Sequence, residues 1–168
     1  TPGMRYDKPE LKNAVENGAV LTSEMEIFFE LCPSHIIAVT GSDGKTTTTS
    51  LIHKMLSDGG YKTWLGGNIG NPLLSFVDEM TEDDYVVLEL SSFQLHTMKK
   101  SPERAVITNL SPNHLDWHID YQEYIDAKTN IYKAMSGENR LVLNADNADS
   151  MKLLPIDNCE VKTFSRRG

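Results

Sequence analysis

The sequence predicts an α/β fold in which a mostly parallel sheet is covered by helices on both faces. Short runs rich in β-branched residues alternate with longer segments in which apolar residues recur at helical spacing. Some runs, such as residues 85–90, are apolar throughout except for one acid near the end, which is typical of strands buried on both faces. A glycine-rich loop also joins one such run directly to a helical segment, as in a βαβ unit.

Capping and terminating residues separate the predicted elements in the first part of the chain. In order, these are a helix over residues 9–18, a strand over 19–21, a helix over 24–31, a strand over 34–40, a helix over 46–58 and a strand over 61–65. Gly18 and Gly59 end the first and third helices, because glycine readily closes a helix. Ser23 is a favourable N-cap for the second helix, and Pro33 stops it.

Apolar periodicity defines the elements of the remaining chain, after a second glycine-rich turn at residues 66–70. These elements are helices over residues 72–80, 121–135 and 146–154 and strands over 85–90, 105–110, 141–143 and 160–164. The helix over 121–135 rests on the spacing of Tyr124, Ile125, Lys128, Ile131 and Tyr132. In the helix over 46–58, the apolar stripe that we expect to face the sheet consists of Leu51, Ile52, Met55 and Leu56.

The composition indicates an ordinary globular domain and argues against two classes of partner. The chain has 168 residues, of which 39% are hydrophobic and 24% charged, so it can bury a sizeable core. A net charge of −8 disfavours general binding to nucleic acid, whose affinity comes from Lys and Arg. No run is long and apolar enough to span a membrane, and no signal peptide is visible, so we expect a cytoplasmic protein. Cys32 and Cys159 lack metal-ligand spacing and are expected to be buried free thiols in a reducing compartment.

A phosphate-binding loop is the strongest functional signal. Residues 34–40 lead at once into Gly41-Ser42-Asp43-Gly44-Lys45-Thr46 and a Thr-rich helix. In this arrangement backbone N–H groups and a helix N-terminus face nucleotide phosphates, the lysine reaches the β and γ oxygens, and the hydroxyl of Thr46 can ligate Mg²⁺. Val39 stands where the general pattern has a further glycine, so the loop is a shorter variant. We expect the nucleotide to contact Gly41, Ser42, Asp43, Gly44, Lys45, Thr46 and Thr47. The alternative is a plain surface turn built on Asp43-Gly44.

Polar residues at the ends of other predicted strands extend this site, because ligands of parallel sheets gather at the carboxyl ends of the strands. Glu89 lies in an apolar run, where a carboxylate is costly unless it is paired or ligates a metal. It is therefore a candidate Mg²⁺ ligand, the alternative being an acid at an exposed strand end. His114 follows another strand and is either a ligand or a packed residue, and His118 competes with it. For Lys128, the residues alone favour a lysine whose ammonium group reaches solvent.

Four separated segments resemble the Mur ligases, ATP-dependent amide-forming enzymes to which folylpolyglutamate synthetase is related. The segments are residues 40–46, 67–70, 89–95 and 109–116, and Ala127-Lys128 completes the pattern. Residues 67–70 and 89–95 are most similar to the family member that adds D-glutamate to UDP-N-acetylmuramoyl-L-alanine. The resemblance thus implies a ligase of peptidoglycan precursor synthesis that uses ATP and Mg²⁺ and forms an acyl phosphate. The resemblance further implies that the central domain of such a ligase, with its mostly parallel sheet, has a fold like that of phosphate-loop ATPases.

The resemblance also assigns roles to individual residues. It implies that Lys45, Glu89, His114 and Lys128 are catalytic, with Thr46 and Glu89 on a first Mg²⁺ and His114 on a second. Lys128 matches a lysine that CO₂ carbamylates, and the resulting anion would support the second metal. Asn68, Ser91 and Gln94 match substrate-contacting positions, and Gly3 matches a loop near the nucleotide-sugar phosphates. Asn113 stands where a relative has aspartate, so no charge-dependent role is carried over to it.

Family members have three domains, which sets the expected organisation of this chain. Residues 1–33 match the tail of an N-terminal nucleotide-sugar domain with its linker, and residues 34–168 match an incomplete central ATP-binding domain. No C-terminal domain is recognised, so we expect the chain to be inactive by itself, and to be a monomer that binds small molecules only. The alternatives are another Mur ligase or a folylpolyglutamate synthetase, a phosphate-loop regulatory module that hydrolyses nucleotide without ligation, and a non-catalytic binding module.

Overall fold

A parallel β-sheet forms the centre of the molecule. The computed structural model describes residues 8–112 and 117–167, and within them six strands pair in the order β2-β3-β1-β4-β5-β6. The strands are β1 (His35–Thr40), β2 (Thr63–Gly67), β3 (Tyr85–Glu89), β4 (Arg104–Ile107), β5 (Arg140–Asn144) and β6 (Glu160–Phe164). Every neighbouring pair of these strands is parallel. The predicted α/β fold with a parallel sheet is confirmed.

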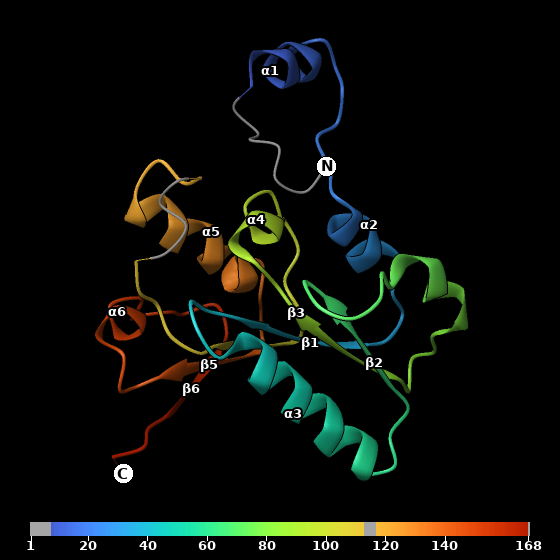
Figure 1. Ribbon diagram of the computed structural model, residues 1–168, viewed down its shortest axis with the longest axis vertical. Coiled ribbons are helices and arrows are strands. Elements are labelled where there is room, and N and C mark those ends of the chain that lie inside the picture. The colour runs from blue at the N-terminus through green and yellow to red at the C-terminus, as the bar shows by residue number, and fades with distance from the viewer. Residues whose placement is uncertain (1–7, 113–116, 168) are drawn as a thin grey trace.

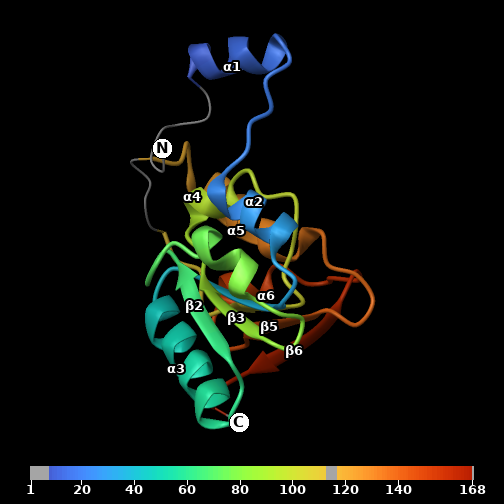
Figure 2. The same ribbon diagram turned by 90° about the vertical axis from the view of Figure 1, so that its right-hand side faces the viewer.

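Helices cover both faces of the sheet, as Figures 1 and 2 show. The helices are α1 (Pro9–Glu16), α2 (Glu24–Leu31), α3 (Lys45–Asp58), the 3-10 helix η1 (Leu74–Glu79), α4 (Ser92–Leu95), α5 (Tyr121–Lys133) and α6 (Ala148–Met151). Helix α3 lies on one face, and α2, α4 and α5 lie on the other. Helix α1 stands apart from the sheet and buries none of its residues. Among the described residues, no helix is both long enough and apolar enough to cross a bilayer.

The core forms where the central strands meet the helices. Val86, Val87 and Leu88 of β3 are fully buried, as a continuously apolar strand with neighbours on both sides requires. Phe28 of α2 and Leu95 of α4 are also fully buried and belong to the same apolar cluster as β3. Burial of each such side chain contributes roughly 1.5–3 kcal/mol. Both cysteines are free, as expected, but they are partly buried rather than buried.

The predicted packing face of α3 is wrong. Leu51 and Met55 are 56% and 72% exposed, whereas Thr49 is fully buried. Ile52 and Leu56 are partly buried, as the stripe required. The helix begins at Lys45, at a position fixed by the phosphate loop, and residues 45, 49, 52 and 56 then lie on one face. This Thr-containing face meets the sheet, so half of the apolar stripe points to solvent.

Several boundaries differ from the predicted ones, and one strand is absent. Residues 19–21 form no strand in the described structure, because no neighbouring strand is available to pair with them and Val20 is 83% exposed. Strand β2 extends through Gly66 and Gly67, which pair with β3. The predicted helix over 72–80 is the 3-10 helix η1, and the single-turn helix α4 was not predicted.

Candidate active site at the carboxyl edge of the sheet

The phosphate loop connects the central strand β1 to α3, and glycine is needed at Gly41. That residue has φ +145°, and a Cβ placed on it would lie 2.0 Å from the Oγ1 atom of Thr108. The same Thr108 hydroxyl donates to the carbonyl oxygen of Asp43 at 2.6 Å. Any side chain at residue 41 would therefore displace a contact that holds the loop.

Asn109, which follows β4, holds the loop from the other side. Its Oδ1 atom accepts hydrogen bonds from the backbone N–H groups of Ser42 and Asp43, at 3.1 and 2.8 Å. Its backbone carbonyl also accepts from Ser42 N at 2.9 Å. Asn109 stood in the resembling segments but received no role from the sequence. In the structure it fixes the conformation of the phosphate loop.

The first turn of α3 is available for an anion. Gly44, with φ +76°, is its N-cap, and the first helical hydrogen bond runs from Thr48 N to Gly44 O. The N–H groups of Lys45, Thr46 and Thr47 therefore have no acceptor within the helix. The ammonium group of Lys45 donates to the carbonyl of Ser42 at 2.9 Å, so it lies over the same loop. The helix dipole and this ammonium group together favour phosphate.

Glu89, the last residue of β3, contacts two other segments at this edge of the sheet, the first turn of α3 and the turn after β2. Its side chain is almost completely buried, and Oε2 accepts a hydrogen bond of 2.6 Å from the hydroxyl of Thr46. Oε1 accepts from the amide nitrogen of Asn68 at 2.9 Å. Close approach of the end of β2 requires glycine, because a Cβ on Gly67 would lie 2.1 Å from the carbonyl oxygen of Glu89. The structure thus brings together Thr46, Asn68 and Glu89, as the sequence predicted, while their roles toward ligands stay predictions.

The oxygen donors at this point suit Mg²⁺. No group of three or more His, Cys, Asp or Glu side chains with metal-binding geometry occurs in the part of the chain that the structure describes. Mg²⁺ does not need one, because it commonly takes one or two protein oxygens and completes its shell with phosphate and water. The adjacent Thr46 hydroxyl and Glu89 carboxylate match that donor set.

Lys128 is buried, contrary to the exposed ammonium group that the residues alone favoured. The lysine is 2% exposed, and its Nζ atom donates to the hydroxyl of Thr40 at 3.3 Å and lies 4.7 Å from the ring centre of Tyr124. Burial lowers the pKa of Lys128 to about 7, helped by the charge of Lys45 and opposed by that of Glu89. The sequence pattern placed Lys128 on the apolar stripe of α5, but a lysine on a half-buried face usually extends its ammonium group to solvent, so its full burial was not predicted.

Ser91 and Gln94 bind each other at the start of α4. The Ser91 hydroxyl accepts from Gln94 N at 3.2 Å, and Gln94 Oε1 accepts from the backbone nitrogen and the hydroxyl of Ser91, each at 3.0 Å. This is a capping box, which fixes both side chains without any ligand. Their predicted contacts with substrate stay predictions. Gly3, Asn113 and His114 lie outside the described residues.

A cleft of about 620 Å³ adjoins the phosphate loop on the side of β4, β5 and β6. It is lined by Asn109, Asn144, Asp146, Asn147, Phe164, Arg166 and Arg167. Apart from Asn109, sequence reasoning did not single these residues out. The position of Asn144 at the end of a predicted strand was the available signal, because the strand-end rule applies to β5 as to the other strands.

Comparison with known proteins identifies the family. Residues 39–168 match the model of the Mur ligase middle domain. The chain belongs to the Mur ligase family. It is 61% identical over 167 residues to the UDP-N-acetylmuramoylalanine–D-glutamate ligase of Acetivibrio thermocellus, a match that covers 99% of this chain and 36% of that protein. The ligase of the same name from Ruminiclostridium cellulolyticum is 65% identical over 147 residues, which are 88% of this chain and 32% of that protein.

A solved Mur ligase structure supports the fold. The MurF ligase from Thermotoga maritima in complex with ADP has a TM-score of 0.67 at 24% identity, over 86% of this chain and 35% of that one. The chain therefore spans about a third of the length of the relatives that it matches.

Proposed function

We propose that this chain is the ATP-binding part of a ligase that joins D-glutamate to UDP-N-acetylmuramoyl-L-alanine in peptidoglycan precursor synthesis. The observation that carries the proposal is the contact between Glu89 of β3 and Thr46 of the phosphate loop, beside Lys45. This contact places two oxygen ligands, from Glu89 and Thr46, beside the ammonium group of Lys45 and the N-terminus of α3. The curated relatives, at 61% and 65% identity, supply the choice of D-glutamate as the amino acid.

The residues of the site suit the activation of a carboxylate by ATP. In the proposed reaction the alanine carboxylate attacks the γ-phosphorus and ADP leaves, and the amine of D-glutamate then displaces phosphate from the acyl carbon and loses a proton. Two anions must meet in the first step, and Lys45 with the N–H groups of α3 would offset their repulsion. Thr46 and Glu89 would hold Mg²⁺, which neutralises charge on the phosphates.

Lys128 is suited to carbamylation by CO₂. Its pKa of about 7 leaves a substantial neutral fraction near neutral pH, and only a neutral amine attacks CO₂. The N–C bond forms, the nitrogen loses a proton, and the side chain becomes an anion. The hydroxyl of Thr40, 3.3 Å from Nζ, is placed to donate to such a group. We assign to this carbamate, with His114, the support of a second Mg²⁺.

The cleft beside the loop is the place for the nucleoside. Asn109 both lines the cleft and binds the phosphate loop, so a ligand with phosphates in the loop extends into the cleft. Phe164, 42% exposed on its wall, offers an aromatic face for a base.

The remaining parts of the activity belong to further domains in this proposal. Of the segment 1–33, residues 1–22 would be the tail and linker of an N-terminal nucleotide-sugar domain, which fits the lack of buried residues in α1. Helix α2 would belong to the central domain instead, because Phe28 is buried in the core beneath the sheet. D-glutamate would require a C-terminal domain outside these 168 residues. The isolated chain would then be a cytoplasmic monomer that binds Mg·ATP weakly and completes no ligation.

A panel of amino acids tests the proposal. The full-length protein is assayed for ADP formation with ATP, Mg²⁺ and UDP-N-acetylmuramoyl-L-alanine, and D-glutamate alone should support turnover. Lys45→Ala should lower the rate by at least about 100-fold, because charge stabilisation is a large part of such catalysis. ADP formation that is independent of any amino acid would favour the regulatory module instead. D-glutamate-dependent ADP release by the isolated chain would contradict the three-domain proposal.

A further inference from the structure

The position of α4 matters to the site because this helix carries Gln94 and has Ser91, two residues after Glu89, as its N-cap. A helix of four residues is too short to be stable by itself, since a helical turn forms at a net cost. The capping box fixes the first turn internally, and Leu95 is buried beneath it. The orientation of α4 therefore depends on what holds its two ends.

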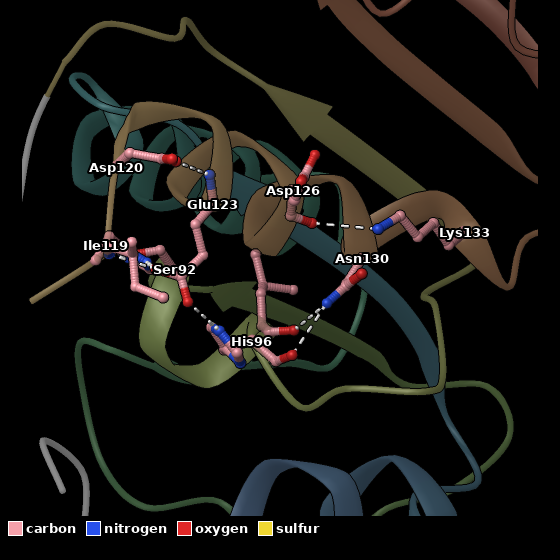
Figure 3. Close-up of polar contacts among 10 residues, drawn as sticks. Ser92, His96, Ile119, Asp120, Glu123, Asp126, Asn130 and Lys133 are labelled. Carbon is pink, nitrogen blue, oxygen red and sulfur yellow. Dashed lines mark hydrogen bonds and ion pairs between the residues drawn. The ribbon is translucent and has the colours of Figure 1, made fainter. Parts of the chain in front are cut away.

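Asn130 of α5 holds the C-terminal end. Its amide nitrogen donates to the carbonyl oxygens of Leu95 and His96, at 2.9 and 3.2 Å. Carbonyl groups at a helix C-terminus have no donor within the helix, so a side-chain amide there replaces water. Figure 3 shows Asn130 reaching from α5 to these two carbonyls.

Glu123, two turns earlier on α5, holds α4 through two histidines. Its Oε1 atom lies 3.1 Å from Nε2 of His96, which follows α4 directly (Figure 3). Its Oε2 atom lies 3.7 Å from Nδ1 of His118. The other ring nitrogen of His118 lies 2.9 Å from the hydroxyl of Ser92, the first residue of α4. The Glu123 carboxylate is thereby paired directly with the C-terminal end of α4 and lies at ion-pair distance from the histidine that contacts its N-terminal end. Oε2 also accepts a hydrogen bond from the backbone N–H of Ile119.

The spacing along α5 makes these contacts act together. Glu123, Ala127 and Asn130 are separated by four and three residues and so lie on one helical face. Ala127 lies between the two polar residues, and it is small and 3% exposed, which allows α4 to approach closely. Lys128 directly follows Ala127 in the same helix. The contacts that hold α4 on α5 therefore also fix the position of α4 relative to Lys128.

We propose that Glu123 and Asn130 are positioning residues, which clamp α4 onto α5 and thereby place Ser91 and Gln94 to bind the muramoyl-alanine nucleotide. We call these two residues the α4 clamp. The inference rests on the proposed function, because it concerns the binding of the muramoyl-alanine nucleotide. The phosphate loop follows β1 and is held by Asn109, by Thr108 and by the hydroxyl of Tyr124, 2.9 Å from that of Ser42. None of these residues belongs to the α4 clamp, so we expect the clamp to leave ATP binding unchanged.

Two variants of the full-length ligase test the α4 clamp. Asn130→Asp removes both donors to α4, and Glu123→Gln keeps the shape while removing the charge that faces His96 and His118. We expect the KM for UDP-N-acetylmuramoyl-L-alanine to rise about tenfold in the first variant and about threefold in the second, as loss of one or two hydrogen bonds predicts. The KM for ATP should stay within about twofold of the unchanged enzyme. Matched controls are Gln122→Glu and Asp126→Asn, which make the same charge changes at exposed positions of α5.

The two KM values separate the possible outcomes. A merely structural role would raise both KM values together, and this result would overturn the inference. A KM for UDP-N-acetylmuramoyl-L-alanine that stays within about twofold in both variants would overturn the inference as well. If Asn130→Asp does not fold, Glu123→Gln and Glu123→Ala decide, with the larger effect expected for alanine. Absence of D-glutamate-dependent turnover in the unchanged enzyme would instead contradict the proposed function.

Discussion

At the scale of single residues, the site depends on a glycine that no other residue can replace. We predict that Gly41→Ala destabilises the isolated chain by about 1–3 kcal/mol, because its Cβ would collide with Thr108 and its φ of +145° disfavours any side chain. ATP binding should also be lost, since Thr108 then no longer holds Asp43. The measurements are urea denaturation and calorimetric titration with Mg·ATP. Gly137→Ala is the control, because it also has positive φ but meets open space, so it should cost about 1 kcal/mol and leave ATP binding unchanged.

The buried amine of Lys128 predicts a pH-dependent stability. Its pKa is about 7 in the folded chain and 10.5 ordinarily, so between these values the unfolded chain binds more protons. The free energy of unfolding should therefore receive a contribution that rises with pH across this window, by up to about 1.4 kcal/mol per pH unit, and is constant below pH 7. Comparison of denaturation curves at several pH values for Lys128→Met and the unchanged chain isolates this contribution. Lys133→Met, a substitution at an exposed position, should keep the pH dependence of the unchanged chain. Equal pH dependence in all three proteins would refute the assignment.

Prediction from single residues succeeded where the sequence itself shows that a charged group must be buried. A carboxylate within the apolar run of β3 had to find partners, and Glu89 finds them in Thr46 and Asn68. Lys128 gave a weaker signal, because a lysine on the apolar stripe of a helix usually extends its ammonium group to solvent. Its burial is set by the packing of α5 against β1, which the sequence pattern does not contain.

At the scale of elements, α3 shows how a loop can determine the packing face of a helix. We predict that Leu51→Ala changes the free energy of unfolding by less than about 0.5 kcal/mol, because Leu51 is largely exposed. The same substitution at Leu56, which is partly buried, should cost about 1–2 kcal/mol. Denaturation of both variants by urea is a direct comparison, since the two differ only in position. A larger loss at Leu51 would mean that the apolar stripe faces the sheet after all.

Element boundaries were predictable where capping residues mark them and unpredictable where tertiary contacts do. Ser23 caps α2 as expected, with its hydroxyl accepting from Glu26 N at 3.1 Å. Helix α4 has a capping box in its sequence, but its single turn exists because Asn130 and Leu95 anchor it. A pattern of four residues cannot reveal such distant partners.

At the scale of the whole molecule, parallel pairing accounts for why distant loops share one edge. The predicted alternation of strands and helices was sufficient to bring the ends of β1, β2, β3 and β4 together, and the structure confirms that arrangement. The order of strands, with β1 between β3 and β4, was not predicted. That order places Glu89 beside the phosphate loop and Asn109 on its other side.

The boundary between the central unit and the preceding segment can be located by truncation. Helix α1 buries none of its residues, whereas Phe28 of α2 is fully buried in the same cluster as Val86 and Leu88. We therefore predict that removal of residues 1–22 changes the free energy of unfolding by less than about 1 kcal/mol, with one cooperative transition retained. Phe28→Ala should cost about 3–5 kcal/mol, because it leaves a cavity beneath the sheet. Urea denaturation followed by circular dichroism measures both. A large loss on truncation would place α1 within the folded unit, whereas the expected result assigns α2 to the central domain and leaves α1 for a neighbouring one.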